Sequence, residues 1–273
     1  MSEKLLDLML EAAIAAARVI DEVYARPFAA TEKSDGSPVT EADAAAEKVI
    51  LEYLAATGIP VLAEESAAAG HIPVLGEKFF VVDPLDGTKE FIKRNGEFTV
   101  NIALVEHGRP TLGVVLAPAT GECFCGGPEG AFTCSVSGST HGERRRIQVD
   151  CAAPMRVVAS RSHGHAALAR LIEDLKIESD VSVGSSLKFC LLARGDAQLY
   201  PRFTPTAEWD TAAGQAVLEA AGGVVLTLDG APLAYGKAER NFLNPFFVAA
   251  SNPDLARKAA MQMRSVEDLQ EPH

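Results

Sequence analysis

The sequence contains no long apolar run and no leader-like start. Its apolar stretches fall short of the roughly 18 to 20 residues that a membrane-spanning helix requires. The first residues also lack the basic segment followed by an apolar one that is typical of a secretory signal. We therefore expect no integral membrane segment and a cytoplasmic location, with peripheral association at the inner face of the plasma membrane as a further expectation.

Basic residues are scarce as well. Lys and Arg number 25 against 37 Asp and Glu, so the formal net charge is -12. A surface that binds nucleic acid or an anionic membrane needs basic patches, so this balance argues against both partners. The one concentrated basic run, Arg144–Arg146, is interpreted as a solvated turn before a strand at Ile147–Val149.

Cysteine is the third scarce residue type. The five cysteines are an odd number, and Cys123 and Cys125 are too close together for a normal zinc pair. Without a secretory signal, the odd number predicts reduced thiols. The strand-like surroundings of the pair indicate that these thiols lie in the core.

The remaining composition is that of an ordinary globular protein, with 48% hydrophobic and 23% charged residues. Apolar residues at helical spacing predict an amphipathic helix over Leu5–Val23. Thr40 with Asp43 three residues later resembles a capping box and predicts a second helix through Leu54. Short apolar runs separated by Gly and Pro predict an antiparallel meander over residues 98–132.

The texture of the sequence changes around residues 150–154. Beyond this point, short apolar strands alternate with helical segments, a pattern that predicts an α/β fold. A chain of 273 residues also exceeds the usual single core. We therefore predict two closely packed parts, residues 1–150 and residues 151–273.

The most informative stretch is Asp83-Pro84-Leu85-Asp86-Gly87-Thr88, which follows the apolar run Phe79–Val82. Two carboxylates at the end of a buried strand suit a cation better than they suit packing, and the proline between them makes the chain turn. Carboxylate and carbonyl oxygens are hard ligands that favour Mg²⁺. A helix that begins after Gly87 would offer free N–H groups to an anion. Asp-Pro and Asp-Gly are also ordinary turn dipeptides, so a simple turn is the alternative.

Further acidic residues stand at other element ends. Glu64 and Glu65 follow the apolar strand Ile59–Ala63, and Asp210 opens a helical pattern. Two adjacent acids are costly to bury unless a cation neutralises them. The alternatives are a solvated loop for the glutamates and a helix cap for Asp210. The sequence leaves two roles open for Asp43, that of a helix cap and that of a catalytic residue.

These motifs resemble those of the inositol monophosphatase superfamily of Mg²⁺-dependent, lithium-sensitive phosphatases. Within it, the sequence is most similar to the CysQ-type 3'(2'),5'-bisphosphate nucleotidases, over residues 33–43, 83–104, 184–191 and 197–203. Residues 64–70 look more like the inositol phosphatase form of the motif. The fold that the resemblance implies is a layered α/β sandwich, with an N-terminal α+β half, a C-terminal α/β half and the site between them.

The resemblance also implies a cofactor and a mechanism. Two or more Mg²⁺ ions would be bound, with Asp83 bridging two of them; the implied metal ligands are Glu64, Asp83, the Leu85 carbonyl, Asp86 and Asp210. Asp43 and Thr88 match the pair that orients and deprotonates the attacking water, and Glu65 matches a position that orders water at the centre. Water is expected to attack directly, without a phosphoenzyme.

A nucleoside bisphosphate carries two phosphates and an adenine, so its site needs added positive charge and a flat apolar wall. Lys188 and Arg202 are candidates for contact with the second phosphate, and Lys93 and Arg94 are further ones. An exposed surface charge is the alternative for each. The full set of substrate contacts implied by the resemblance is Glu64, Leu85, Asp86, Gly87, Thr88, Ser185, Ser186, Lys188, Arg202 and Asp210.

The expected function is hydrolysis of the 3'-phosphate of 3'-phosphoadenosine 5'-phosphate to AMP, in the nucleotide recycling of sulfur assimilation. 3'-Phosphoadenosine 5'-phosphosulfate is a second expected substrate, and the protein is expected to be a monomer or a homodimer. One alternative is an inositol monophosphatase or a broad sugar-phosphate phosphatase. A more distant one is a non-catalytic regulator that binds a phosphometabolite. The complete set of candidate residues argues against the regulator: Asp43, Glu64, Asp83, Asp86, Thr88 and Asp210.

Overall fold

The computed structural model describes residues 2–33, 36–152, 155–159, 171, 173, 175, 177 and 179–265. Ser34 and Asp35 of the family-like segment, Ala153 and Pro154 at the predicted boundary and the C-terminal residues 266–273 lie outside these ranges.

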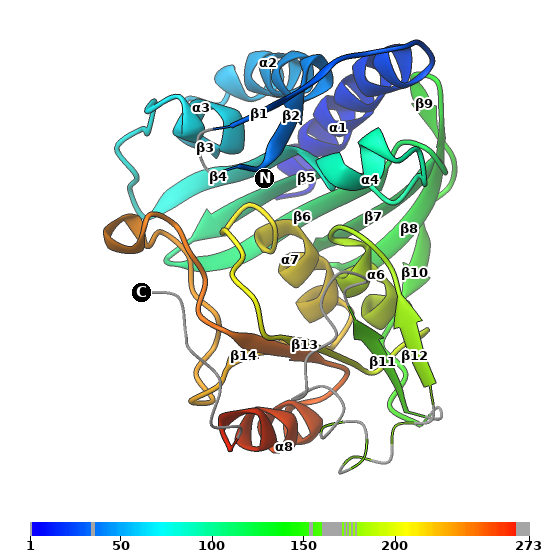
Figure 1. Ribbon diagram of the computed structural model, residues 1–273, viewed down its shortest axis with the longest axis vertical. Coiled ribbons are helices and arrows are strands. Elements are labelled where there is room, and N and C mark those ends of the chain that lie inside the picture. The colour runs from blue at the N-terminus through cyan, green and yellow to red at the C-terminus, as the bar shows by residue number, and fades with distance from the viewer. Residues whose placement is uncertain are drawn as a thin grey trace.

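The described chain is built in alternating layers of helices and sheets (Figure 1). Helices α1 (Ser2–Tyr24) and α2 (Glu41–Ala55) cover one face of a large sheet. Helices α6 (Leu187–Ala193) and α7 (Ala212–Ala220) lie between that sheet and a smaller one, whose far face is covered by α8 (Pro253–Arg264). The predicted layered α/β architecture is confirmed.

The large sheet is a meander with one crossover at its edge. Its strand order is β10-β8-β7-β6-β5-β4-β3, with β9 paired to β8. All neighbours are antiparallel except β3 and β4, which are parallel. The strands are β3 (Val61–Ala63), β4 (Lys78–Asp86), β5 (Thr99–Glu106), β6 (Arg109–Ala117), β7 (Glu122–Gly127), β8 (Gly130–Ser137), β9 (Thr140–His141) and β10 (Arg145–Ile147).

The smaller sheet is mixed, with the order β12-β11-β13-β15-β14. Its strands are β11 (Arg156–Ala159), β12 (Ser179–Ser182), β13 (Leu199–Arg202), β14 (Val224–Thr227) and β15 (Phe247–Ala250). The remaining elements of the described ranges are the hairpin of β1 (Ala30–Glu32) and β2 (Pro38–Thr40), the short helices α3 (Glu64–Ala68) and α4 (Thr88–Ile92), and a 3₁₀ turn at Ala238–Arg240.

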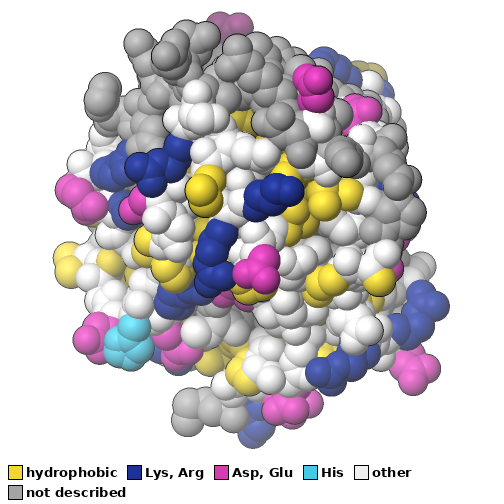
Figure 2. Space-filling model, turned by 90° about the horizontal axis from the view of Figure 1, so that it is seen from below, with side chains coloured by type: hydrophobic (Ala, Val, Ile, Leu, Met, Phe, Trp, Pro, Cys, Tyr) yellow, Lys and Arg dark blue, Asp and Glu magenta, His cyan; other side chains and the backbone are white. Residues whose placement is uncertain are grey.

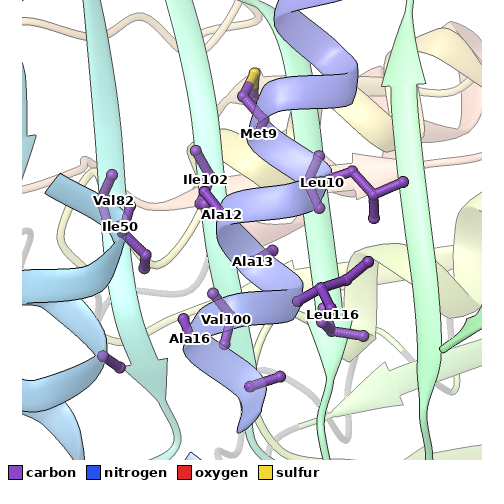
Figure 3. Packing of buried hydrophobic residues seen from close by; sticks show 14 of the residues in the cluster. Met9, Leu10, Ala12, Ala13, Ala16, Ile50, Val82, Val100, Ile102 and Leu116 are labelled. Atoms are coloured by element: carbon purple, nitrogen blue, oxygen red, sulfur yellow. The ribbon is translucent and has the colours of Figure 1, made fainter. Parts of the chain in front are cut away.

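Helix α1 packs on the large sheet through small and branched residues (Figure 3). Ala12, Ala13 and Ala16 are fully buried against the sheet, and Leu10 belongs to the same core cluster as Leu116 of β6. The alanines have short side chains, so the helix axis can approach the strands closely. Each fully buried Leu or Ile adds about 1.5 to 3 kcal/mol to the stability of such a core.

Helix α7 lies on the other face of the same sheet, and glycines allow its close approach. A Cβ at Gly113 of β6 would stand 2.4 Å from the Ala213 carbonyl oxygen, and one at Gly126 of β7 would stand 2.5 Å from the Val217 Cα. No side chain fits in that space, so the contact requires glycine at both positions. Asp210 lies just before α7, so the close packing of α7 also fixes the distance of Asp210 from the large sheet.

The sequence-based elements are largely confirmed. The first helix, the capped second helix, the meander and the α/β alternation all occur. Arg145 and Arg146 belong to strand β10, so the basic run extends into the strand that was expected to start at Ile147. The five cysteines are free, and Cys123 and Cys125 are buried. The division into residues 1–150 and 151–273 stays a prediction, and one core cluster joins both parts, with Phe79 and Val81 of β4 packed together with Phe189 and Phe247.

None of the helices in the described part of the chain is both long and apolar enough to cross a membrane. Figure 2 shows the molecule from the side of α8. Several basic side chains lie near the middle of this face, next to apolar ones, and acidic side chains lie beside and around them. The visible face therefore has mixed charge.

Candidate metal centre and active site

The site begins at an irregularity in strand β4. Its pairing with β5 is regular up to Asp83, which lies opposite Asn101, and then shifts before Asp86 pairs with Thr99. The intervening Pro84 donates no ladder hydrogen bond, and the Leu85 N–H instead donates to Asp83 Oδ1 at 3.0 Å. Because the strand bulges here without ending, both carboxylates face the same side.

Gly87 then turns the chain into helix α4. Its φ of 97° lies in the left-handed region, and a Cβ there would stand 3.0 Å from the Glu97 carbonyl oxygen. Only glycine adopts this conformation without strain in so little space. The predicted helix start after Gly87 is confirmed, and the first N–H groups of α4 lie next to the acidic turn.

The structure brings Asp210 next to the two aspartates of the turn, Asp83 and Asp86. Carboxylate oxygens of Asp83, Asp86 and Asp210 all lie within 4.8 Å of one another. Burial, together with the nearby charges of Glu64, Asp86 and Asp210, raises the pKa of Asp83 well above its ordinary value. Burial, together with the charges of Asp86 and Glu64, raises the pKa of Asp210 to about 7.

Glu64 completes this acidic centre. Its charge contributes to the raised pKa of Asp83, and burial raises the pKa of Glu64 itself, although Lys33 opposes the shift. Among the described residues, none of the three aspartates forms an ion pair. Such a cluster is unstable without a compensating cation, and its donors are all hard oxygens. The residues therefore fit a divalent cation such as the one that the sequence predicted.

Lys33 forms the one ion-pair contact of the two glutamates within the described ranges. Its Nζ lies 2.8 Å from Glu64 Oε1 and 2.5 Å from Glu65 Oε1, and all three side chains are mostly buried. The carboxylates raise the pKa of Lys33 despite the opposing effect of burial. Burial raises the pKa of Glu65 to about 7. The sequence suggested no role for Lys33, because its acidic partners lie about 30 residues further along the chain.

Asp86 and Asp210 are connected by a polar bridge. Asp86 Oδ2 accepts from the Ser186 N–H at 2.6 Å and from Asn101 Nδ2 at 3.1 Å. The same Nδ2 donates to Ser186 Oγ at 2.9 Å, and Ser186 Oγ donates to the Asp210 carbonyl oxygen at 2.8 Å. The sequence did not predict a role for Asn101. The signal that identifies it is its position directly opposite Asp83, which is known only from the register of β4 and β5.

Asp210 does not cap helix α7. The residue at the cap position is Thr211, and Asp210 Oδ2 instead accepts from the Ala207 N–H at 2.8 Å, closing a turn before the helix. The capping alternative for this residue is therefore wrong. The Asp210 carboxylate also takes part in the acidic cluster with Asp83 and Asp86.

Asp43 serves in two interactions at once. Its Oδ2 accepts from the Thr40 N–H and hydroxyl, both at 2.8 Å, which completes the capping box of α2. Its Oδ1 accepts from the Thr88 hydroxyl at 3.1 Å. Burial raises the pKa of Asp43, and the hydrogen bonds from Thr40 and Thr88 oppose the shift. Asp43 can therefore cap α2 through one oxygen and contact Thr88, as a catalytic role requires, through the other.

A cleft of about 700 Å³ opens over this centre. Acidic groups line its floor, and Trp209 and Phe242 form part of its wall, with their ring centroids 6.3 Å apart. Of the other predicted substrate residues, Leu85 is buried beneath the turn and Ser186 lies in the polar bridge. Ser185 has a left-handed φ of 48° at the start of α6.

The candidate basic residues differ in their surroundings. Lys188 is almost completely buried, donates to the Ser185 carbonyl oxygen at 2.7 Å and lies over the Tyr200 ring. Burial lowers the pKa of Lys188 to about 8, although Asp86 opposes the shift. Arg202 donates to the carbonyl oxygens of Thr204 and Pro205 beside the cleft.

The other two candidates are less suited to the cleft. Arg94 donates to the carbonyl oxygens of Tyr24 and Arg26, and its guanidinium lies over the Tyr24 and Phe28 rings. It is therefore occupied in holding the C-terminal end of α1. Lys93 is exposed, and the residues that line the cleft include none of the four basic candidates, so Lys188 and Arg202 differ from Lys93 in their contacts with the acidic centre.

The fold and site together define a layered α/β protein whose acidic centre is suited to a divalent cation. The sequence profile of the inositol monophosphatase family matches residues 1–270. The chain is 48% identical over 247 residues to the 3'(2'),5'-bisphosphate nucleotidase CysQ of Escherichia coli O157:H7, covering 89% of this chain and 98% of that protein. It is 40% identical to the corresponding protein of Buchnera aphidicola over 253 residues, covering 91% and 94% of the two chains.

Solved structures agree. CysQ from Bacteroides thetaiotaomicron superposes with a TM-score of 0.77 at 38% identity, covering 91% of this chain and 98% of that one. An inositol monophosphatase from Anabaena superposes with a TM-score of 0.73 at 26% identity, covering 98% of both chains. The chain belongs to the inositol monophosphatase family, and it is a phosphatase of that family.

Proposed function

We propose that this protein is a Mg²⁺-dependent 3'(2'),5'-bisphosphate nucleotidase that converts 3'-phosphoadenosine 5'-phosphate to AMP and phosphate. The observation that carries the proposal is the cluster of Asp83, Asp86 and Asp210 oxygens within 4.8 Å, in a chain 48% identical to CysQ. 3'-Phosphoadenosine 5'-phosphosulfate is a second substrate, and the metabolic role is nucleotide recycling in sulfur assimilation.

The acidic centre would hold two or more Mg²⁺ ions through Glu64, Asp83, the Leu85 carbonyl, Asp86 and Asp210. Mg²⁺ bound there would neutralise the phosphate oxygens and stabilise the leaving oxygen. The reasons for choosing Mg²⁺ are the all-oxygen donor set and the absence of His and Cys among these residues.

Asp43 and Thr88 activate the attacking water. The Thr88 hydroxyl donates to Asp43 Oδ1, so the lone pairs of Thr88 Oγ1 are directed away from that carboxylate. A water proton then passes to Thr88 Oγ1 as the hydroxyl proton passes to Asp43 Oδ1. Burial, by raising the Asp43 pKa, makes this carboxylate a stronger base than an ordinary aspartate.

The rest of the cleft binds the nucleotide. Gly87 and Thr88 present backbone N–H groups to the phosphate that is cleaved, and Glu65 orders water beside it. Ser185 and Ser186 contact the substrate from the start of α6. Asp86 and Asp210 act on the pKa of Lys188, and Arg202 opposes the rise in the pKa of Asp210, so both cations are close enough to the acidic centre to compensate the charge of the second phosphate.

Turnover of 3'-phosphoadenosine 5'-phosphate and of inositol 1-phosphate, measured side by side with Mg²⁺, tests the proposal. We expect kcat/KM for the bisphosphate to exceed that for the inositol phosphate by at least about a hundredfold, the discrimination that one or two charge-assisted contacts provide. A preference for inositol 1-phosphate would contradict it and would favour the inositol monophosphatase alternative. The cytoplasmic location and the monomeric or dimeric state stay predictions.

A further inference from the structure

Helix α3 carries Glu64 and Glu65 in its first turn, yet the preceding residue does not cap it. Ala63 has an extended backbone (φ -122°, ψ 144°), and no side-chain hydrogen bond caps the helix from that position. The first N–H groups of a helix need acceptors, which Ser, Thr, Asp or Asn at the cap position normally supplies. The acceptor for α3 has to come from another element.

Glu47 of α2 is that acceptor. Its Oε2 accepts from the Glu65 N–H at 2.8 Å, and its Oε1 accepts from the Ser66 N–H at 2.9 Å and from the Ser66 hydroxyl at 2.5 Å. The Glu47 residue is only 5% exposed. A buried carboxylate forms strong hydrogen bonds with the N–H groups at a helix start. Because both oxygens are engaged, the position and the rotation of the first turn of α3 are fixed.

A carboxylate is a costly way to cap this helix. Glu64 and Glu65 already bring two negative charges to the same turn, and a Ser or Thr at position 63 would cap it without a third. Glu47 does what a local cap cannot do, because it joins α3 to α2. Asp43 lies four residues earlier, one turn along the same buried face of α2. A single helix therefore holds Asp43 and the start of the segment that carries Glu64.

We propose that Glu47 is a positioning residue of the cation site, which holds the Glu64 carboxylate against Asp83 so that the acidic centre is assembled before a cation binds. The inference rests on the proposed function, in which Glu64 is a cation ligand. Glu64 lines the cleft together with Asp86 and Asp210, so a small rotation of α3 would move its carboxylate away from the acidic centre. Removal of a hydrogen bond that orients a metal ligand typically weakens metal binding by about tenfold to a hundredfold.

Binding of Mn²⁺ to the whole protein without substrate, measured by calorimetry, tests the proposal. Glu47→Gln preserves the volume but turns an amino group toward a backbone N–H, and we expect about tenfold weaker Mn²⁺ binding. Glu47→Asp preserves the charge but is one methylene shorter, and it should lose a similar factor. Glu52→Gln, on the exposed face of α2, is the matched control and should bind Mn²⁺ as the wild type does.

Ser66→Ala is a milder variant, because it removes only the hydroxyl hydrogen bond, and it tests the proposal if the Glu47 variants do not fold. We expect it to weaken Mn²⁺ binding by about threefold, less than the Glu47 variants do, because the two backbone N–H groups keep their carboxylate acceptor. The half-saturating Mg²⁺ concentration for activity should rise by the same factor as the Mn²⁺ dissociation constant in each variant, and kcat at saturating Mg²⁺ should stay near the wild-type value.

Two results would overturn the proposal. The first is a Glu47→Gln or Glu47→Asp variant that binds Mn²⁺ as tightly as the wild type and only unfolds at a lower temperature, which would make Glu47 a structural cap. If neither variant folds, the same result in Ser66→Ala would count against the proposal. A lower kcat at saturating Mg²⁺ with unchanged Mn²⁺ affinity would place its effect outside the cation site. If the wild type bound no Mn²⁺ or Mg²⁺ at all, the proposed function itself would fail, and the inference with it.

Discussion

The Ser186 N–H donates to Asp86 Oδ2 at 2.6 Å, across 100 residues of sequence. This hydrogen bond joins the start of α6, which lies between the two sheets, to the acidic turn of the large one. Asn101 reinforces it, because its Nδ2 lies 3.1 Å from Asp86 Oδ2 and 2.9 Å from Ser186 Oγ. The acidic centre therefore depends on the packing of the two sheets as well as on the turn.

Replacement of Asn101 tests this dependence. Asn101→Leu preserves the volume and removes both hydrogen bonds, so Asp86 should be less well oriented and kcat/KM should fall by about tenfold. Thr99→Val is the matched control on the same strand, because the buried Thr99 hydroxyl has no hydrogen-bond partner in the described part of the chain. Steady-state kinetics at saturating Mg²⁺ should show little change for Thr99→Val. Equal losses in the two variants would mean that only packing is affected.

Asp83→Asn tests the metal assignment. Asp83 is the most buried acid of the centre, and the change removes a negative charge from a cluster of like charges. We expect activity to fall by more than about a hundredfold, while the unfolding temperature without divalent cations stays the same or rises. Turnover within about tenfold of the wild-type value would contradict a bridging role for this residue.

The stability of the metal-free protein should depend on pH. Burial raises the pKa of Asp210 and of Glu65 to about 7, and burial also raises the pKa of Asp83 well above its ordinary value. A carboxyl group whose pKa is raised by folding binds its proton more tightly in the folded state, so stability increases as the pH falls from about 8 toward about 5. Thermal unfolding in EDTA should therefore show a higher midpoint at about pH 6 than at about pH 8.

Saturating Mg²⁺ should reduce or reverse this trend, since the cation then replaces the protons as the compensating charge. A midpoint in EDTA that rises between about pH 6 and about pH 8 would show that these carboxyl groups do not dominate the titration.

Lys188→Met and Arg202→Met test which residue meets the phosphate that is not cleaved. Each variant is assayed on 3'-phosphoadenosine 5'-phosphate and on adenosine 3'-monophosphate. A charge-assisted contact to phosphate contributes about 1.5 to 3 kcal/mol, so a selective loss of about tenfold to a hundredfold on the bisphosphate is expected. Because Lys188 also holds the Ser185 carbonyl, its variant should lose some activity on both substrates. Equal losses on both substrates for Arg202→Met would remove that residue from the specificity site.

Local sequence patterns were sufficient for the elements and for most of the candidate acids. The Thr40 and Asp43 spacing predicts the capping box that the structure contains, and the Asp83–Thr88 turn predicts acids next to a helix start. Such signals arise within one turn or one strand, where neighbouring residues alone decide the conformation. Gly87 is a local signal of the same kind, because the turn itself requires its left-handed φ.

What the tertiary structure alone decided is which of these local features meet. Lys33 pairs with Glu64, Glu47 caps α3, and Asn101 bonds Ser186, across separations of 31, 18 and 85 residues. Each contact depends on how helices and sheets pack, for example on the close approach of α7 that Gly113 and Gly126 allow, and no short-range pattern encodes that. The sequence by itself thus determined that carboxylates would stand at strand and helix ends. Only the packing of the layers decided that Asp83, Asp86 and Asp210 share one centre, because burial in a common core brings together groups that the chain separates by more than 120 residues.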